Sequence, residues 1–153
     1  MSRAFVKETD DAPTELPDRP VSPHRNLVTA EGLAAIEAEI ERLGAAHADA
    51  MTKGDNAASA AVARDLRYWT ARRASAEVVA AKTDKGQVHF GDIVTVQRQD
   101  GRTQTFRIVG EDEADPAHGT VSHVSPLARA LFGKGVGDVA EGAGGEIEIL
   151  AIA

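Results

Sequence analysis

The densest group of side chains that could bind a cation is acidic and lies in the C-terminal half of the chain. Glu111, Asp112, Glu113 and Asp115 fall within five residues. Carboxylate oxygens suit calcium and magnesium, but a calcium-binding EF-hand loop needs a fixed spacing that ends in a bidentate glutamate. That spacing is absent, so we interpret the run from Glu111 to His118 as a solvated loop.

Other signals for catalysis or ligand binding are weak. The chain contains no cysteine, which excludes a thiolate nucleophile, a disulfide and a cysteine-ligated zinc site. Gly142, Gly144 and Gly145 precede neither a Lys-Ser/Thr pair nor a helix, so they predict a turn rather than a phosphate-binding loop. His47 has no second metal-binding side chain one helical turn away, so we assign it to a helix flank.

A short polar loop, Thr52-Lys53-Gly54-Asp55-Asn56, separates two stretches with helical periodicity. Gly54 can end the first helix in a left-handed conformation, and Asp55 or Asn56 can cap the second. A tight turn between two helices therefore accounts for every residue of the loop.

The stretches on either side of this loop predict an antiparallel helical hairpin, with Thr29 as the first N-cap and a second helix from about Asn56 to Ala81. Apolar residues at coiled-coil spacing form the two expected seams: Leu33, Ile36, Ile40 and Leu43, then Val62, Leu66 and Trp69. Glutamates on the first helix can pair with arginines on the second, although exposed pairs are weak. A hairpin of this length must project from a body or pair with another chain.

Residues 1–27 read as an N-terminal arm. Four prolines between residues 13 and 23 forbid a helix and remove donors from any sheet. Acidic residues and prolines are mixed with few apolar residues, so we expect an extended or disordered tail in which Ala4-Phe5-Val6 is a small apolar patch.

Residues 83–153 read as a small β-rich domain. Strands are expected at 88–97, with a bend or bulge at Gly91-Asp92, and at 103–109, 120–124 and 146–152, with a hairpin turn at Asp100-Gly101. Ser125 can cap a short helix that begins at Pro126 and ends at Gly133. The fold class is therefore α+β: a tail over 1–27, a helical hairpin over 28–82, and an antiparallel sheet with one short helix over 83–153.

Several separated motifs, in order, resemble the GreA/GreB family of transcription factors. Val124–Asp138, with Gly86–Gly91, Phe106–Glu113 and Glu146–Leu150, is similar to the family's C-terminal domain. Arg64–Arg73 is similar to the base of its second hairpin helix, nearer the GreB form. The resemblance covers residues 29–153 and leaves the tail as an extension. It implies an FKBP-like C-terminal domain and a factor that binds bacterial RNA polymerase and inserts the hairpin into its secondary channel.

The resemblance also implies site residues. Family tips carry Gly-Asp, two residues and Glu-Asn, and their two carboxylates help to hold magnesium in the polymerase active centre. Gly54-Asp55 matches, but the glutamate and its spacer are missing and the hairpin is ~12–15 Å shorter. Asp55 is thus the only candidate catalytic and magnesium-binding residue, and we expect no cofactor of the protein's own and no efficient transcript cleavage. Ser125 and Pro126 correspond to the region that docks on the polymerase.

Three alternatives stay open. The first is an active cleavage factor, in which Asp49 joins Asp55 in presenting carboxylates. The second is an FKBP-type prolyl isomerase, for which Phe90, Phe106 and Phe132 offer few aromatics to line a proline pocket. The third is a structural dimer formed through the hairpin.

Charge and hydropathy restrict the partners and the compartment. The net charge is −7, and residues 83–153 alone carry −5, so neither general nor sequence-specific binding to nucleic acid is expected. No apolar run approaches the ~20 residues of a membrane span, and the N-terminus lacks the apolar core of a signal peptide. We therefore expect a cytoplasmic protein without membrane contact.

Overall fold

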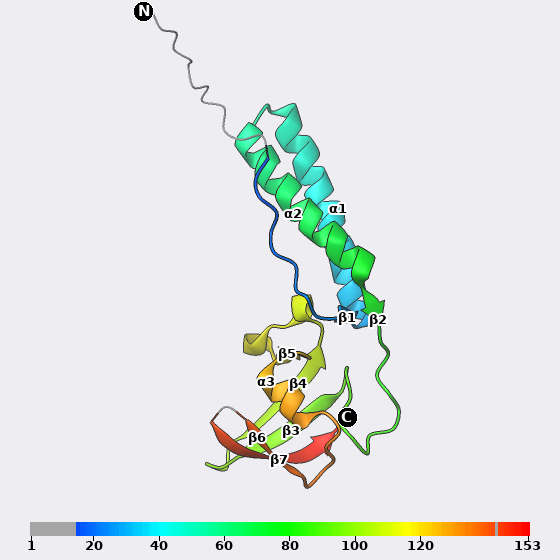
Figure 1. Ribbon diagram of the computed structural model, residues 1–153, viewed down its shortest axis with the longest axis vertical. Coiled ribbons are helices and arrows are strands. Elements are labelled where there is room, and N and C mark those ends of the chain that lie inside the picture. The colour runs from blue at the N-terminus through cyan, green and yellow to red at the C-terminus, as the bar shows by residue number, and fades with distance from the viewer. Residues whose placement is uncertain (1–14, 143) are drawn as a thin grey trace, which may run out of the picture. The chain divides into compact units, whose positions relative to one another are not determined.

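The computed structural model describes residues 15–142 and 144–153, which group into two compact units (Figure 1). Within the described residues, the first unit holds 15–23 and 35–75, and the second holds 24–34 and 76–153. The segment 24–34, at the start of the expected hairpin, thus groups with the β-rich residues. No helix in this part of the chain combines the length and the apolar character needed to span a membrane.

Two helices joined by a short turn form the predicted hairpin: α1 (Ala30–Thr52) and α2 (Asn56–Ser75). Thr29 caps α1 as predicted, because its Oγ1 accepts a hydrogen bond from the Gly32 N–H at 2.9 Å. The second helix ends at Ser75 instead of Ala81. The chain leaves the helix there because Glu77 N–H donates to the Asn26 carbonyl at 2.9 Å.

That hydrogen bond belongs to a two-stranded parallel sheet that the sequence did not predict. Strand β1 (Leu27–Val28) pairs with β2 (Glu77–Val78), and both strands lie in the second unit. The Val79 N–H extends the ladder to the Val28 carbonyl at 2.9 Å.

Apolar packing along the hairpin follows the predicted seam on α1 more closely than on α2. Of the predicted α1 seam, Ile36 and Leu43 are buried, and Leu33 and Ile40 are half-buried. The three seam residues predicted for α2 are half-buried: Val62, Leu66 and Trp69. Across the seam, Arg73 Nε lies 3.1 Å from Glu37 Oε2, and Ser59 Oγ lies 3.3 Å from His47 Nε2. These pairs confirm that the helices run antiparallel and that an arginine of α2 meets a glutamate of α1.

The second unit contains a five-stranded sheet with the spatial order β5-β4-β3-β7-β6. Its strands are β3 (Ile93–Arg98), β4 (Thr103–Val109), β5 (Thr120–Ser122), β6 (Val139–Gly142) and β7 (Gly145–Ile152). All neighbours pair antiparallel except β4 and β5, which are parallel. The α+β class is confirmed, and the sheet is mixed rather than wholly antiparallel.

A short helix, α3 (Pro126–Leu131), packs on this sheet and closes its core. Ala128 and Leu131 of α3 are fully buried in a cluster of apolar side chains from all five strands of this sheet, including Val94, Phe106 and Ile149. Gly133 follows the helix with φ +81°, as expected for a residue that ends a helix in the left-handed region.

The bend expected at Gly91-Asp92 is present, but it is a turn that precedes β3, so residues 88–92 do not belong to the strand as expected. Gly91 adopts φ +90°, which reverses the chain direction. The fully buried Asp92 carboxylate then accepts a hydrogen bond from the His89 N–H at 2.8 Å and pairs with Lys85 Nζ at 2.6 Å. A buried carboxylate with these partners stabilises a turn, so the strand cannot start earlier.

The expectation of a solvated acidic loop at 111–118 was wrong for Glu113. The segment forms two 3₁₀ turns, η1 (Glu111–Glu113) and η2 (Pro116–His118). The Glu113 carboxylate accepts hydrogen bonds from the Thr29 N–H at 3.0 Å, from Thr29 Oγ1 and from the Gly110 N–H at 3.1 Å. Glu113 therefore holds the residue that caps α1.

Replacing this carboxylate should destabilise the second unit. Glu113→Ala leaves three donors without their acceptor, and we expect the free energy of unfolding to fall by about 1–3 kcal/mol. Urea denaturation followed by circular dichroism measures the loss. Glu148→Ala, at an exposed carboxylate of the same unit, is the matched control; equal losses in the two variants would contradict the role assigned to Glu113.

Candidate functional site

The tip of the hairpin is a tight turn whose geometry follows from its glycine. Gly54 has φ +67°, its N–H donates to the Met51 carbonyl at 3.1 Å, and the Asp55 N–H donates to the Ala50 carbonyl at 3.0 Å. This pattern is a Schellman motif, which satisfies the last carbonyls of a helix and needs a residue that tolerates positive φ. The tip is therefore a defined turn, exposed on all sides.

Asp55, the candidate magnesium ligand, has a structural role in this turn. Its Oδ1 accepts a hydrogen bond from the Ala58 N–H at 3.0 Å, and its carbonyl accepts from the Ser59 N–H at 2.9 Å. Asp55 is thus the N-cap of α2, as the residue type predicted. One carboxylate oxygen is used for the cap, and the side chain remains exposed.

Asp49, the second carboxylate considered for the tip, is paired with a lysine. Lys53 Nζ lies 3.0 Å from Asp49 Oδ2, one helical turn away. Among the residues that the structure describes, no cluster of three or more His, Cys, Asp or Glu side chains could hold a metal ion. Because magnesium prefers six oxygen ligands, Asp55 could supply at most a minority of a magnesium shell.

Ser125 and Pro126 lie where α3 begins, in the second unit. Ser125 is the N-cap of α3, and its Oγ accepts a hydrogen bond from the Ala128 N–H at 3.2 Å. Pro126 is the first helical residue and is exposed, whereas Ser125 is half-buried. The predicted cap and helix start are confirmed, and the pair presents a rigid, uncharged corner.

His123, two residues before this corner, was missed by the sequence analysis. The residue is 8% exposed, and its ring packs edge-on against Phe90, with centroids 5.5 Å apart. Its Nε2 has no hydrogen-bond partner among the described residues. Burial lowers the pKa of His123, while the nearby Glu111 acts in the opposite direction. His123 follows Val121 by two residues, so both side chains fall on the same face of the expected strand. This spacing was the one sequence signal that could have predicted the burial of His123.

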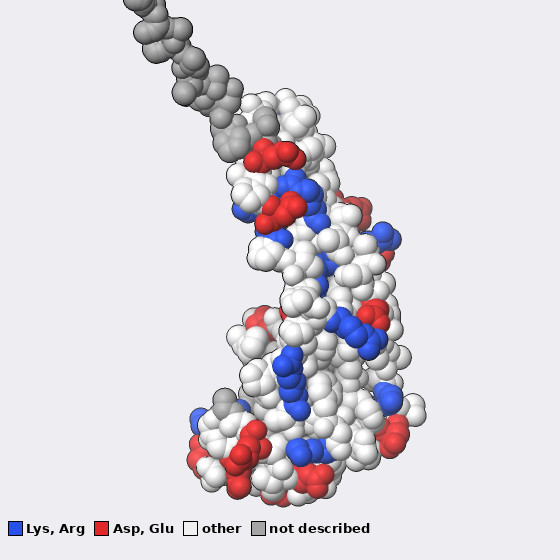
Figure 2. Space-filling model, in the orientation of Figure 1, with Lys and Arg blue, Asp and Glu red and all other residues white. Residues whose placement is uncertain are grey.

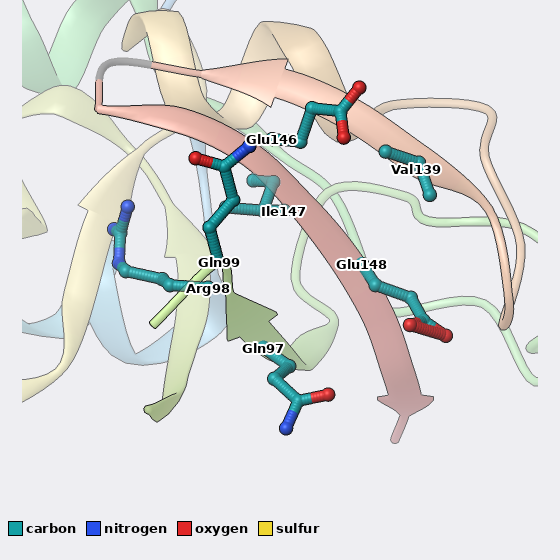
Figure 3. A pocket seen from close by; sticks show the side chains of 7 residues that line it. All are labelled: Gln97, Arg98, Gln99, Val139, Glu146, Ile147 and Glu148. Carbon is teal, nitrogen blue, oxygen red and sulfur yellow. The ribbon is translucent and has the colours of Figure 1, made fainter. Parts of the chain in front are cut away.

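A shallow hollow of about 170 Å³ lies on the sheet near the β6–β7 hairpin (Figure 3). Its lining mixes polar, charged and aliphatic side chains: Gln97, Arg98, Gln99, Val139, Glu146, Ile147 and Glu148. In Figure 3 the Gln97, Glu146 and Glu148 side chains point in different directions instead of converging on one point. None of the three phenylalanines proposed for a proline pocket lines it.

Acidic side chains gather over the same hairpin, as Figure 2 shows. Glu141 and Glu146 face each other across β6 and β7, and Glu148 lies two residues further along β7 on the same face. All three are exposed. Direct like-charge pairs weaken a sheet slightly, so this surface contributes charge rather than stability.

Comparison with known proteins identifies relatives along most of the chain. The family model for the C-terminal domain of the transcription elongation factors GreA and GreB matches residues 82–153. Transcription elongation factor GreA of Hyphomonas neptunium is 38% identical over 134 residues, which cover 74% of this chain and 85% of that protein. GreB of Neisseria meningitidis is 43% identical over 96 residues, or 58% of each chain. The crystal structure of Gfh1 from Thermus thermophilus aligns with 85% of this chain and 99% of its own, at 19% identity and a TM-score of 0.41.

The cap at the tip can be separated from the charge of its carboxylate. Asp55→Ala removes the acceptor of the Ala58 N–H, so the free energy of unfolding should fall by about 1 kcal/mol. Asp55→Asn keeps an equally good cap and should change the free energy by only a few tenths, about 0.3 kcal/mol. Chemical denaturation of both variants measures this difference, and equal losses would show that the charge, not the cap, stabilises the turn.

The buried His123 should make the second unit less stable in mild acid. Because its native pKa lies below the value of 6.5 for an unperturbed histidine, the unfolded chain binds more protons as the pH falls through 6.5. The free energy of unfolding should therefore decrease between about pH 7.5 and 5.5. His123→Leu should flatten that decrease in pH-dependent denaturation, and an unchanged pH profile would contradict the assignment.

Proposed function

The chain belongs to the GreA/GreB family of transcription elongation factors, and from this premise we propose that it is a cytoplasmic regulator of bacterial RNA polymerase. It has no catalytic centre of its own in this proposal. The second unit docks on the polymerase, and the hairpin enters the secondary channel, where it changes elongation by occupying space rather than by promoting transcript cleavage.

The observation that carries the proposal is the state of the tip carboxylates. Asp55 caps α2, and Asp49 is paired with Lys53. Cleavage of the transcript requires an activated water, which a second, well-held metal ion can supply. A single carboxylate with one oxygen already hydrogen-bonded holds such an ion poorly. The polymerase would therefore gain little help with cleavage from this tip.

Docking through the α3 corner rests on its chemistry. Pro126 is exposed, and the Ser125 side chain is fixed by the hydrogen bond that it accepts from the Ala128 N–H. Neither residue carries a charge, whereas the second unit as a whole is acidic. A preorganised, uncharged corner loses little conformational freedom on binding, which favours its use as a contact point.

A transcript-cleavage assay with stalled elongation complexes tests the proposed mode of action. We expect the protein to bind the complexes and to leave the cleavage rate within about twofold of the rate of polymerase alone. A twofold change corresponds to less than about 0.5 kcal/mol in the activation barrier. Asp55→Asn should not change that rate. Robust cleavage that disappears in Asp55→Asn would show that the protein is instead an active cleavage factor.

A pull-down with polymerase tests the docking corner. Ser125→Glu combined with Pro126→Ala places a charge at the corner and loosens the helix start, so binding should weaken by about tenfold or more, or roughly 1.4 kcal/mol. The control combines Thr103→Glu with Pro116→Ala, which makes the same changes at exposed positions elsewhere in the unit. If the corner variant binds as well as the control, docking takes place elsewhere.

A further inference from the structure

The described part of the N-terminal arm lies along α2 and has a regular repeat (Figure 1). Between residues 15 and 24, only Leu16, Arg19 and Ser22 are partly buried, and every residue between them is exposed. The prolines follow at the next positions, Pro17, Pro20 and Pro23. A repeat of three residues in both burial and proline content is the period of a polyproline II helix.

An arginine of α2 contacts both the backbone and a side chain of the arm. Arg67 on α2 donates from Nε to Asp18 Oδ1 at 2.5 Å and from its terminal nitrogen to the Leu16 carbonyl at 2.8 Å. Polyproline II backbones have no internal hydrogen bonds, so their carbonyls are available to an external donor. Arg67 thus binds both the backbone and an acidic side chain of the arm.

A second pair of contacts binds Arg19, the next residue of the arm. The Arg19 guanidinium lies 4.0 Å from the centroid of the Tyr68 ring and 3.3 Å from Asp65 Oδ1. Tyr68 in turn packs edge-on against Trp69, with centroids 5.1 Å apart. An aromatic face beside a carboxylate favours a cation, so the charges of Asp18 and Arg19 are each matched by an opposite group on α2.

The covered side of α2 has the properties of a binding surface. All residues from 61 to 69 are half-buried, because α1 covers one side of the helix and the arm covers another. Each side chain of the two ion pairs to the arm is at least 32% exposed to water. Pairs exposed to that extent are weak, so the arm can leave without disrupting the hairpin.

We propose that Asp65, Arg67 and Tyr68 form a docking face for a polyproline II peptide segment of another protein, and that the arm is its resident, displaceable occupant. The segment it accepts presents a carboxylate followed by a guanidinium between two prolines, as Pro17-Asp18-Arg19-Pro20 does. Proline-spaced segments suit this use because they are extended before they bind and lose little entropy. The residues of this face belong neither to the tip nor to the α3 corner, and the proposal does not depend on polymerase binding.

Occupancy by the arm implies competition. The arm is tethered to the hairpin that it covers, so its effective concentration at the face is in the millimolar range, about 1 mM or more for a short link. A partner peptide must therefore either bind more tightly than the arm or arrive when the arm has been released. Only the fraction of molecules whose arm has left the face can bind the partner peptide. The apparent affinity for the peptide is therefore reduced in proportion to that fraction.

The test is a nuclear magnetic resonance titration of the full chain with a synthetic peptide of residues 15–24. In Asp18→Ala/Arg19→Ala, whose substitutions are confined to the arm, the peptide should shift the amides of residues 61–69 in a saturable way. Wild type should need at least about threefold more peptide for half-saturation, because its own arm competes.

Two further substitutions supply the controls, each made in the Asp18→Ala/Arg19→Ala variant, which we call the released chain because its arm no longer pairs with α2. Arg67→Ala should abolish the saturable shifts. Arg73→Ala, at an arginine of the same helix that pairs with Glu37 and not with the arm, should leave them unchanged. Absence of saturable shifts in the released chain, or shifts that survive Arg67→Ala, would overturn the proposal, as would equal peptide binding by the wild type and the released chain.

Discussion

The first turn of every helix leaves backbone N–H groups that need acceptors, and this requirement organises the described part of the chain. A polar side chain meets it at each of the three α-helices: Thr29 at α1, Asp55 at α2 and Ser125 at α3. Two of these caps are also the residues to which the family resemblance assigns a role. Their chemistry at the surface is therefore limited by what the fold already requires of them.

This double use separates the two candidate sites. At the tip, the cap occupies an oxygen of the only carboxylate that matches the family pattern, which works against metal binding. At the α3 corner, the same kind of cap fixes the position of Ser125 and leaves Pro126 exposed. A cap thus weakens one function, the holding of an ion, and supports another, the presentation of a rigid surface.

How far the sequence predicted this structure depended on the range of the interactions involved. Local signals succeeded: the apolar spacing of Ile36 and Leu43, the left-handed Gly54 and the Ser125-Pro126 cap each act within a few residues. Long-range ones failed. Glu113 was taken for a solvated residue because the threonine that it holds is 84 residues away. Likewise, two-residue strands such as β1 and β2 carry no periodic pattern.

A cross-link from the hairpin tip in an elongation complex tests most directly whether the hairpin enters the secondary channel. Because the chain contains no cysteine, Lys53→Cys places a single thiol at the exposed tip for a photoactivatable cross-linker. We expect cross-links to polymerase residues that line the secondary channel, without an accompanying rise in transcript cleavage. Cross-links confined to the outer surface of the polymerase, or none in a complex that demonstrably contains the protein, would contradict it.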